Sequence, residues 1–319
     1  MNARYRFVSV VIPVFRDGLR AVVAVRQTRA QHLPPNVALE IVLVDDGSDD
    51  DTAAQLASLS PSEASVFRLT TNQGRSVARN VGAKGATGDV LVFMDCDCLP
   101  MGNEFLTAHL EALASGAIAS TGPVTGDGDG FWDRYQREAS QRRERQHREG
   151  MQYAGSSQNL AVRRDAFVAV GGFDAGYRRY GFEDRDLLLR LANTGTIAWA
   201  PEATVRHLDR INLTQVSSKM AEAGALSSLR FADTHPKAYR ALGFARLDAR
   251  KRRWLRRPAQ VLDGTLPSVA RNVEFLLQRA WIPYAAKAAV VRLVTGLSYL
   301  AGTSRPIPVA ELEPSTPKP

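Results

Sequence analysis

Short apolar segments rich in β-branched residues alternate with helical segments through the first two thirds of this chain. Segments of this kind, closed by polar residues or glycine, are typical of strands buried on both faces of a sheet. The expected strands cover 8–14, 40–44, 65–70, 89–94, 159–162, 197–200 and 204–207. The expected helices cover 19–32, 52–59, 76–85, 132–149, 165–170 and 184–192. This alternation predicts an α/β fold with a mostly parallel, Rossmann-like mixed sheet and helices on both faces.

The pattern changes near residue 212, where strand signals stop and helical segments take over. Helices are expected there at 214–232, 236–242, 265–278 and 283–300. The last residues are rich in proline, which favours disorder. We therefore predict a domain over 1–212, a helical extension over 213–303 and a disordered tail over 304–319.

Composition is ordinary for a globular protein, but the charge is unevenly distributed. The net charge is +8, and a dense cationic cluster contains Arg250, Lys251, Arg252, Arg253, Arg256 and Arg257. Such a cluster can contact anionic lipid, nucleic acid or a phosphorylated substrate, and charge alone does not choose among them. We read no signal peptide and no run of about twenty apolar residues, so we expect a cytoplasmic protein. Cys96 and Cys98, the only cysteines, are expected to be buried thiols.

Acidic residues follow three of the expected strands: Asp17, the pair Asp45–Asp46, and the pair Asp95 and Asp97. The carboxyl ends of parallel strands meet at one edge of a sheet, where ligands bind. Two carboxylates at alternating strand positions project to one side, and divalent cations prefer oxygen ligands. His207 ends another expected strand and is a sensible third ligand beside Asp97, because imidazole suits Mn²⁺.

A second acidic segment, Glu183–Asp184, begins an expected helix directly after an aromatic and glycine-rich turn. The helix dipole alone favours one acid at such a position. It does not account for the whole acidic run, so a partly desolvated carboxylate here is a candidate general base.

Five segments together resemble the inverting family 2 glycosyltransferases of the GT-A fold. They occur in the order Val10–Phe15, Val44–Ser48, Asn72–Asn80, Met94–Asp97 and Gly171–Leu187, and the resemblance covers residues 8–209. The stretch Gly181–Leu187, followed by His207, is also similar to the galactosyltransferase-like carboxy-terminal segment of bacterial polymerases and β-1,4-galactosyltransferases. The resemblance implies a donor-binding half over about 1–100 and an acceptor-side half over about 101–212.

The resemblance also implies roles for individual residues. It implies that the nucleotide of a diphosphate sugar, with uridine preferred, is held by Pro13, Val14, Phe15, Asp46, Asn72, Gly74, Arg75 and Asp95. It implies Mn²⁺ or Mg²⁺ on Asp97 and His207, with Asp95 facing the metal or the ribose. It implies Asp184 as catalytic base, and an acceptor and sugar side lined by Glu183 and Asn159. Trp132 is a further candidate for this side, because it stands beside the glycine-rich segment 126–130, where a movable loop can begin. The implied reaction is transfer of a sugar to the hydroxyl of a glycan or glycoconjugate, with inversion.

Three other functions are alternatives for this chain. A nucleotidyltransferase-type α/β enzyme also uses paired carboxylates and metals, but it normally carries a glycine-rich basic loop after the first strand, which residues 15–18 lack. A glycosidase uses two opposed carboxylates and no metal, so it does not account for Asp95 and Asp97 together with His207. A basic nucleic-acid-binding protein is supported only by the cationic cluster at 250–257, without a recognised motif, so no nucleic acid is expected.

The carboxy-terminal helices leave two interpretations open. The segment 281–300 mixes apolar residues with Lys287 and Arg292 and lies near the cationic cluster. It can lie in the plane of an anionic membrane, which would place the protein at the cytoplasmic face. The alternative is that these helices pack on the catalytic domain or on a second subunit of a homodimer.

Overall fold

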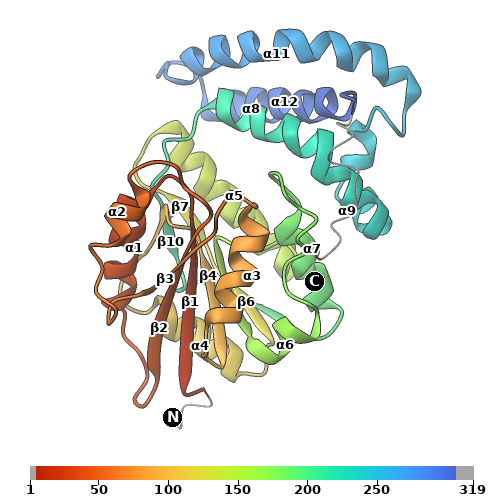
Figure 1. Ribbon diagram of the computed structural model, residues 1–319. Coiled ribbons are helices and arrows are strands. Elements are labelled where there is room, and N and C mark those ends of the chain that lie inside the picture. The colour runs from red at the N-terminus through yellow and green to blue at the C-terminus, as the bar shows by residue number, and fades with distance from the viewer. Residues whose placement is uncertain (1–4, 307–319) are drawn as a thin grey trace. The chain divides into compact units, whose positions relative to one another are not determined.

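Seven strands form one sheet in the order β3-β2-β1-β4-β8-β6-β9 (Figure 1). Only β8 runs against its neighbours, because it pairs antiparallel with β4 and β6, while the other pairs are parallel. The strands are β1 (Phe7–Val14), β2 (Ala38–Asp45), β3 (Ser65–Arg68), β4 (Val90–Met94), β6 (Ala119–Thr121), β8 (Asn159–Arg163) and β9 (Ile197–Trp199). The predicted α/β fold with a mostly parallel sheet is confirmed.

The structure, a computed structural model, describes residues 5–306, and these divide into two compact units. Unit 1 contains the residues up to 174 together with 184–209, and unit 2 contains 175–183 together with the residues from 210 onward. The helices of unit 1 are α1 (Gly18–Arg29), α2 (Thr52–Leu56), α3 (Arg75–Gly85), α4 (Phe105–Ala114), α5 (Phe131–Arg148), α6 (Arg164–Ala169) and α7 (Glu183–Ala192), whose first residue belongs to unit 2.

Helices cover both faces of the large sheet, as the alternation of side chains along β1 requires. Val10 and Ile12 point into one core, which is filled by side chains of α1 and α4. Val11 points into the other, which is filled by side chains of α3, α6 and α7. Because successive side chains of a strand face opposite sides, an apolar run without polar positions is what a sheet between two helical layers needs.

A second, three-stranded sheet lies in the same unit and was not predicted. It contains β5 (Cys98–Pro100), β10 (Val205–His207) and β7 (Val124–Gly126), in that order. Strand β10 pairs antiparallel with β5 and parallel with β7. The glycine-rich segment 126–130 therefore begins inside a strand before it leads into α5.

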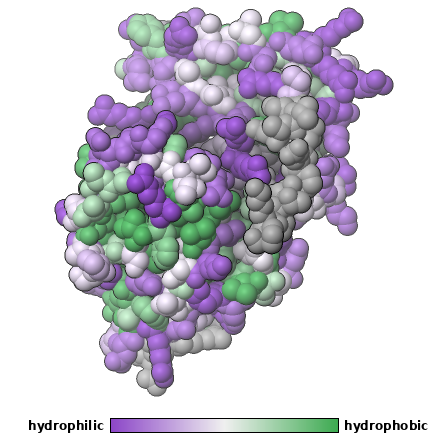
Figure 2. Space-filling view, viewed as in Figure 1, coloured by the Kyte–Doolittle hydropathy of each residue, from purple (hydrophilic) through white to green (hydrophobic). Residues whose placement is uncertain are grey.

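Strand β3 lies at one edge of the large sheet. Figure 2 shows apolar residues gathered over this part of the face that it draws. Val66 and Phe67 of β3 are exposed. Beside it lies a cavity of about 420 Å³ between β3 and α2. Its lining includes Leu56, Ala57 and Val66, with Asp45 and Arg68 as its charged members.

Unit 2 is helical, as predicted for the carboxy-terminal region. Its elements are α8 (Leu213–Glu222), the π-helical turn η1 (Ala223–Ser227), α9 (Ser228–Thr234), α10 (Pro236–Ala241), the 3₁₀ turns η2 (Phe244–Leu247) and η3 (Arg253–Leu255), α11 (Arg256–Leu277) and α12 (Tyr284–Thr303). Helices α8, α11 and α12 pack on one another. A Cβ atom at Gly224 would lie 2.3 Å from the Tyr299 carbonyl oxygen, so glycine permits the close approach of η1 and α12.

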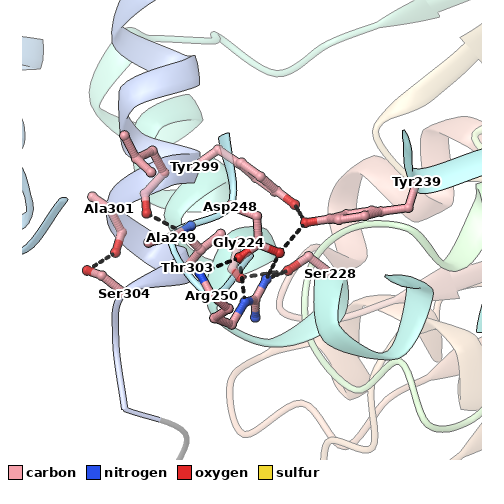
Figure 3. Close-up of polar contacts among 11 residues, drawn as sticks. Gly224, Ser228, Tyr239, Asp248, Ala249, Arg250, Tyr299, Ala301, Thr303 and Ser304 are labelled. Atoms are coloured by element: carbon pink, nitrogen blue, oxygen red, sulfur yellow. Dashed lines mark hydrogen bonds and ion pairs between the residues drawn. The ribbon is translucent and has the colours of Figure 1, made fainter. Parts of the chain in front are cut away.

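A buried polar network holds unit 2 together around Asp248 (Figure 3). Its carboxylate accepts hydrogen bonds from the Tyr239 hydroxyl at 2.8 Å and from Arg250 Nε at 2.9 Å. Arg250 Nη2 also donates to Ser228 Oγ at 2.6 Å, and the Tyr239 and Tyr299 hydroxyls lie 2.7 Å apart. Burial raises the pKa of Asp248, but the hydrogen bonds and charge of Arg250 outweigh it and leave that pKa lowered.

Two expectations for this region are wrong. Arg250 was expected among surface cations, but it is largely buried and paired with Asp248. The helix expected at 265–278 begins nine residues earlier, at Arg256, and continues through Pro267. In the part of the chain that the structure describes, no helix has both the length and the apolar character needed to cross a bilayer. The tail predicted to be disordered lies outside the described residues from 307 onward.

Candidate active site

The loop that leaves β4 carries Asp95, Cys96 and Asp97 and leads directly into β5. The pairing of β5 with β10 sets His207 opposite Cys98, one residue from Asp97. As a result, His207 Nε2 lies 3.2 Å from Asp97 Oδ2. The structure therefore brings together the two residues that the sequence proposes as metal ligands.

Asp209 is a third member of this group, and sequence reasoning missed it. Asp97, His207 and Asp209 each offer one ligand atom, and these atoms lie within 4.8 Å of one another. Asp209 follows His207 by two residues, so an extended backbone turns both side chains to one side. This spacing behind a short strand was the one signal that could have identified it.

Arg20 and Asp17, at the start of α1, extend the cluster. Arg20 Nη1 lies 2.6 Å from Asp209 Oδ1 and 3.2 Å from Asp17 Oδ2. Burial raises the pKa of Asp17. Arg20 lowers it, but the charges of Asp97 and Asp209 also raise it, so the pKa is raised overall. Three carboxylates thus face one arginine and one imidazole, which is an environment that attracts a cation.

The donor set fits a divalent metal. Burial lowers the pKa of His207, but the hydrogen bond and charge of Asp97, with Asp209 and Asp95, leave that pKa raised. Its Nδ1 is buried and has no hydrogen-bond partner among the described residues. Two carboxylates and one imidazole suit Mn²⁺, and carboxylate oxygens suit Mg²⁺.

Asp95 lies next to this group but has a different partner. Its Oδ1 accepts a hydrogen bond at 2.6 Å from Arg79 Nη2, which is completely buried on α3. Burial raises the pKa of Asp95, yet the charges of Arg79 and Arg75 leave it lowered. Arg79, which sequence reasoning did not select, thereby holds Asp95 as a carboxylate. A metal or ribose role for Asp95 stays a prediction.

The predicted nucleotide side lies at the ends of β1 and β2 and at the start of α3. Pro13 and Val14 end β1, and Phe15 follows it with a partly exposed ring. Asp46, which was expected to help bind the nucleotide, accepts hydrogen bonds from two backbone amides, Gln73 N at 2.8 Å and Gly74 N at 2.9 Å. This pairing fixes the turn that contains Asn72 and Gly74 and leads to Arg75, the first residue of α3.

The neighbouring Asp45 lies differently. Its Oδ1 accepts the Ser48 amide at 2.9 Å, and its Oδ2 lies 3.3 Å from Arg68 Nε. Both side chains line the cavity of about 420 Å³ beside β3.

Glu183 and Asp184 occupy the start of α7, after a strained turn. Gly181 and Phe182 both have positive φ, 99° and 71°, and a positive φ at a bulky aromatic residue is rare. Asp184 Oδ1 accepts the Arg185 amide at 2.8 Å and the residue is half-buried, whereas Glu183 is buried. Strain of this kind persists only where packing enforces it, and it is enriched at functional sites.

The remaining predicted acceptor residues, Asn159 and Trp132, are buried. Asn159 Oδ1 lies 2.8 Å from His109 Nε2, and its Nδ2 donates to the carbonyls of Pro123 and Ala203. Its side chain therefore joins β8 to the loops before β7 and β10. Trp132 packs edge-on against Tyr135 on α5. Contact of either residue with an acceptor stays a prediction.

The comparison with protein families decides the classification. A model described as "Glycosyl transferase family 2" matches residues 9–183, which is more than half of the chain. The chain belongs to glycosyl transferase family 2. This membership disfavours the nucleotidyltransferase and nucleic-acid-binding alternatives.

Curated relatives match over part of their length. An undecaprenyl-phosphate 4-deoxy-4-formamido-L-arabinose transferase of Pseudomonas savastanoi pv. phaseolicola is 31% identical over 178 residues, which is 55% of this chain and 47% of that protein. Glycosyltransferase AglE of Haloferax volcanii is 27% identical over 185 residues, which is 54% of this chain and 58% of that protein. The chain thus spans about half the length of these relatives.

Solved structures agree on the fold. The mannosyltransferase PcManGT from Pyrobaculum calidifontis, in complex with GDP-Man and Mn²⁺, superposes with a TM-score of 0.56 at 19% identity and covers 95% of this chain and 87% of its own. S. aureus TarS superposes with a TM-score of 0.54 at 15% identity, over 93% of this chain and 90% of its own. The chain has the GT-A fold that its sequence predicts.

Proposed function

We propose that this protein is a metal-dependent, inverting glycosyltransferase that moves a sugar from a nucleotide-diphosphate sugar to an acceptor hydroxyl. The observation that carries the proposal is the group formed by Asp97, from the loop after β4, with His207 and Asp209 from the end of β10, in a family 2 chain. Mn²⁺ accompanies the nucleotide sugar in the structural neighbour PcManGT, which supports a cation at this place.

The residues of this chain divide the reaction between them. The Asp184 carboxylate takes the proton from the acceptor hydroxyl, and the acceptor oxygen forms its bond to the anomeric carbon. The bond from that carbon to the donor phosphate breaks, and its electron pair leaves with the nucleoside diphosphate. A cation on Asp97, His207 and Asp209 would neutralise the departing diphosphate. A single base opposite the leaving group gives inversion, and no covalent intermediate is needed.

Donor recognition is proposed for the edge of the sheet at β1, β2 and α3. Asp46 shapes the turn before α3 through two backbone amides, so its role is to position Gly74 and Arg75. Asp45, which shares the cavity beside β3 with Arg68, is then the better candidate for a contact with the base. We propose a uridine nucleotide as the donor group, and a glycan or glycoconjugate as the acceptor.

A donor screen tests the function directly. The full chain is incubated with a panel of nucleotide sugars and Mn²⁺ or Mg²⁺, and the released nucleoside diphosphate is measured, followed by the anomeric configuration of any product. We expect release with a narrow set of donors and loss of release in chelator. Equal release in the presence and absence of chelator would refute the metal dependence. Retention of configuration would refute the role of Asp184 as a single base.

A further inference from the structure

Helix α11 has two different long faces. Ala259, Leu266, Ala270 and Leu277 recur at helical spacing and are buried. This face packs against α8 and α12. The opposite face carries residues spaced by three or four positions, which therefore lie on one side of the helix: Arg257, Val261, Gly264, Ser268, Arg271 and Phe275. All six are exposed, and we call them the α11 outer face.

Large apolar side chains are exposed on this face and at both ends of the helix. Val261 is 70% exposed and Phe275 is 62% exposed. Trp254 precedes the helix and Trp281 follows it, with exposed fractions of 71% and 78%. Tryptophan is rarely left this exposed, because burying its ring removes a large apolar area from water. Tryptophan side chains at the two ends of a surface helix are typical of anchors at a membrane–water interface.

The charge around this face is almost entirely positive. Residues 251–292 contain nine basic and two acidic side chains, so they carry +7 of the chain's formal net charge of +8. The two acids point away from the outer face and are already engaged. Asp263 pairs with Arg305 at 2.7 Å, and Glu274 Oε2 accepts the Leu213 amide at 2.6 Å. Arg279 stacks its guanidinium over the Phe275 ring at 4.2 Å, so a cation and an apolar ring share one surface.

We propose that the α11 outer face, with Trp254 and Trp281, binds the surface of an anionic membrane. The helix would lie in the plane of the bilayer, with its apolar side chains among the lipid headgroups and its arginines on the lipid phosphates. A second copy of this chain is disfavoured as the occupant, because two faces of the same strong positive charge repel one another. A nucleic acid is disfavoured because exposed Val261 and the two distant tryptophans do not form a basic groove for a phosphate backbone.

The surface differs from the one that the sequence suggested. The segment expected to lie on the membrane was 281–300, but α12 buries much of its length in unit 2, including Val291, Val294 and Leu300. Figure 2 shows apolar and hydrophilic residues intermixed over the α11 region on the face that it draws. The membrane-binding face is therefore assigned to α11 and its flanking tryptophans.

Vesicle co-sedimentation tests this proposal with the full chain and without any donor, so its result is independent of the proposed enzyme activity. Vesicles of phosphatidylcholine alone and of phosphatidylcholine with phosphatidylglycerol are compared at low and high salt. We expect binding to the anionic vesicles at low salt, with a blue shift of tryptophan fluorescence. We expect binding to weaken steeply at high salt, because surface charges are then screened.

Two double variants separate the apolar and the charged contributions. Arg257→Gln with Arg271→Gln should weaken binding about thirtyfold, because each arginine near an anionic surface contributes about 1 kcal/mol. Trp254→Ser with Trp281→Ser should weaken it at least about tenfold and abolish the fluorescence shift. The matched controls are Arg26→Gln with Arg148→Gln, and Val168→Ser, which change exposed residues of unit 1 and should leave binding unchanged.

Several outcomes would overturn the proposal. Absence of binding to anionic vesicles at low salt would do so, as would equal loss of binding in the control variants. The same variants are measured by light scattering for dimerisation and by fluorescence anisotropy with a mixed-sequence oligonucleotide. If vesicles are not bound, a dimer that the tryptophan variant dissociates would reassign this face to a second copy of the chain. Oligonucleotide binding that the arginine variant removes would reassign it to a nucleic acid. All substituted residues are exposed, so unchanged thermal unfolding is expected and verifies folding.

Discussion

Loss of the Asp184 carboxylate should separate chemistry from binding. This carboxylate is half-buried at the start of α7 and accepts the Arg185 amide, a bond that an asparagine oxygen can also accept. We predict that Asp184→Asn lowers kcat by about 10²–10⁴-fold, the usual contribution of a general base. The calorimetric Kd for nucleoside diphosphate should stay unchanged. Asp165→Asn, at an exposed position, is the control, and retained turnover in Asp184→Asn would remove it as the base.

Asp209 allows a test of the metal group that the sequence alone did not suggest. Asp97→Ala removes one of three grouped donors, and Asp209→Ala removes another. We predict that either variant weakens Mn²⁺ binding at least about tenfold in titrations followed by electron paramagnetic resonance. Nucleoside diphosphate binding should become insensitive to chelator. Asp127→Ala, an exposed carboxylate of the same unit, should bind Mn²⁺ like the unaltered chain. Undiminished Mn²⁺ affinity in Asp209→Ala would limit the site to Asp97 and His207.

The sequence could predict site residues that stand at the ends of strands. It could not predict residues whose partners are set by tertiary packing. Asp97 and His207 each follow an apolar segment, which marks the edge of the sheet. Asp209 lies in a polar stretch without periodicity, so its spacing of two residues from His207 is the only local signal that distinguishes it. Arg250 looked like a surface cation because it stands in a run of basic residues, yet Asp248 and Ser228 enclose it. A run of basic residues shows only that the segment is rich in positive charge. Whether each side chain is buried depends on the residues that pack around it.

Helix α4 contributes a buried histidine that makes the fold sensitive to acid. His109 Nδ1 lies 2.8 Å from Ser120 Oγ and its Nε2 lies 2.8 Å from Asn159 Oδ1, which joins α4 to β6 and β8. Burial lowers the pKa of His109 to about 4, although the Asn159 hydrogen bond raises it. In the unfolded chain the pKa is near the ordinary value of about 6.5. The unfolded state therefore binds more protons between these pH values.

The expected sign follows from that difference in proton binding. The contribution of His109 is fully present above pH about 6.5 and is lost as the pH falls toward about 4, by about 3 kcal/mol in total. We predict that between pH 7 and pH 4 the free energy of unfolding of the unaltered chain falls by about 3 kcal/mol more than that of His109→Gln, which has no imidazole to titrate. Urea unfolding at pH 7 and pH 4 measures it, with His32→Gln as an exposed control. Parallel pH profiles for the unaltered chain and His109→Gln would contradict the prediction.

Among the elements that the structure describes, every strand of four or more residues was predicted, whereas of the five three-residue strands only β9 and β10 were. Except for β6, the strands of the large sheet were expected, because they lie in apolar, β-branched segments. Strands β5, β6 and β7 have three residues each, too few to show a period, and all three were missed. Two of them, β5 and β7, flank β10 and thereby place His207 against Asp97. The sequence could therefore propose the ligands but not the small sheet that joins them.

At the scale of the whole molecule, the two units do not follow the order of the chain. Residues 175–183 belong to unit 2, although unit 1 residues stand on either side of them. Within unit 2 the ring of Phe182 lies 4.8 Å from that of Phe231 and 4.9 Å from that of Phe244. Ser227 Oγ donates to the Tyr180 carbonyl at 2.9 Å. The domain boundary proposed near residue 212 therefore leaves out a segment that lies directly before Asp184.

A chain shortened to residues 1–212 should show this dependence. It would lose Phe231, Phe244 and η1, so Phe182 and Tyr177, both buried in the full chain, would be exposed to water. The positive φ of Phe182 would then lose the packing that maintains it. We predict that residues 175–183 become the first site of limited proteolysis and that transfer activity is lost, because the start of α7 is no longer fixed.

A variant of the full chain separates this effect from truncation itself. Phe182→Ala removes the same ring contacts while keeping every helix, and it should lower the free energy of unfolding by about 3–5 kcal/mol. It should reproduce the new cleavage site and the loss of kcat, whereas the donor Kd should change little, because the proposed donor residues lie in β1, β2 and α3. If residues 1–212 resist protease and transfer sugar as well as the full chain does, unit 2 has no part in holding Glu183 and Asp184 in place.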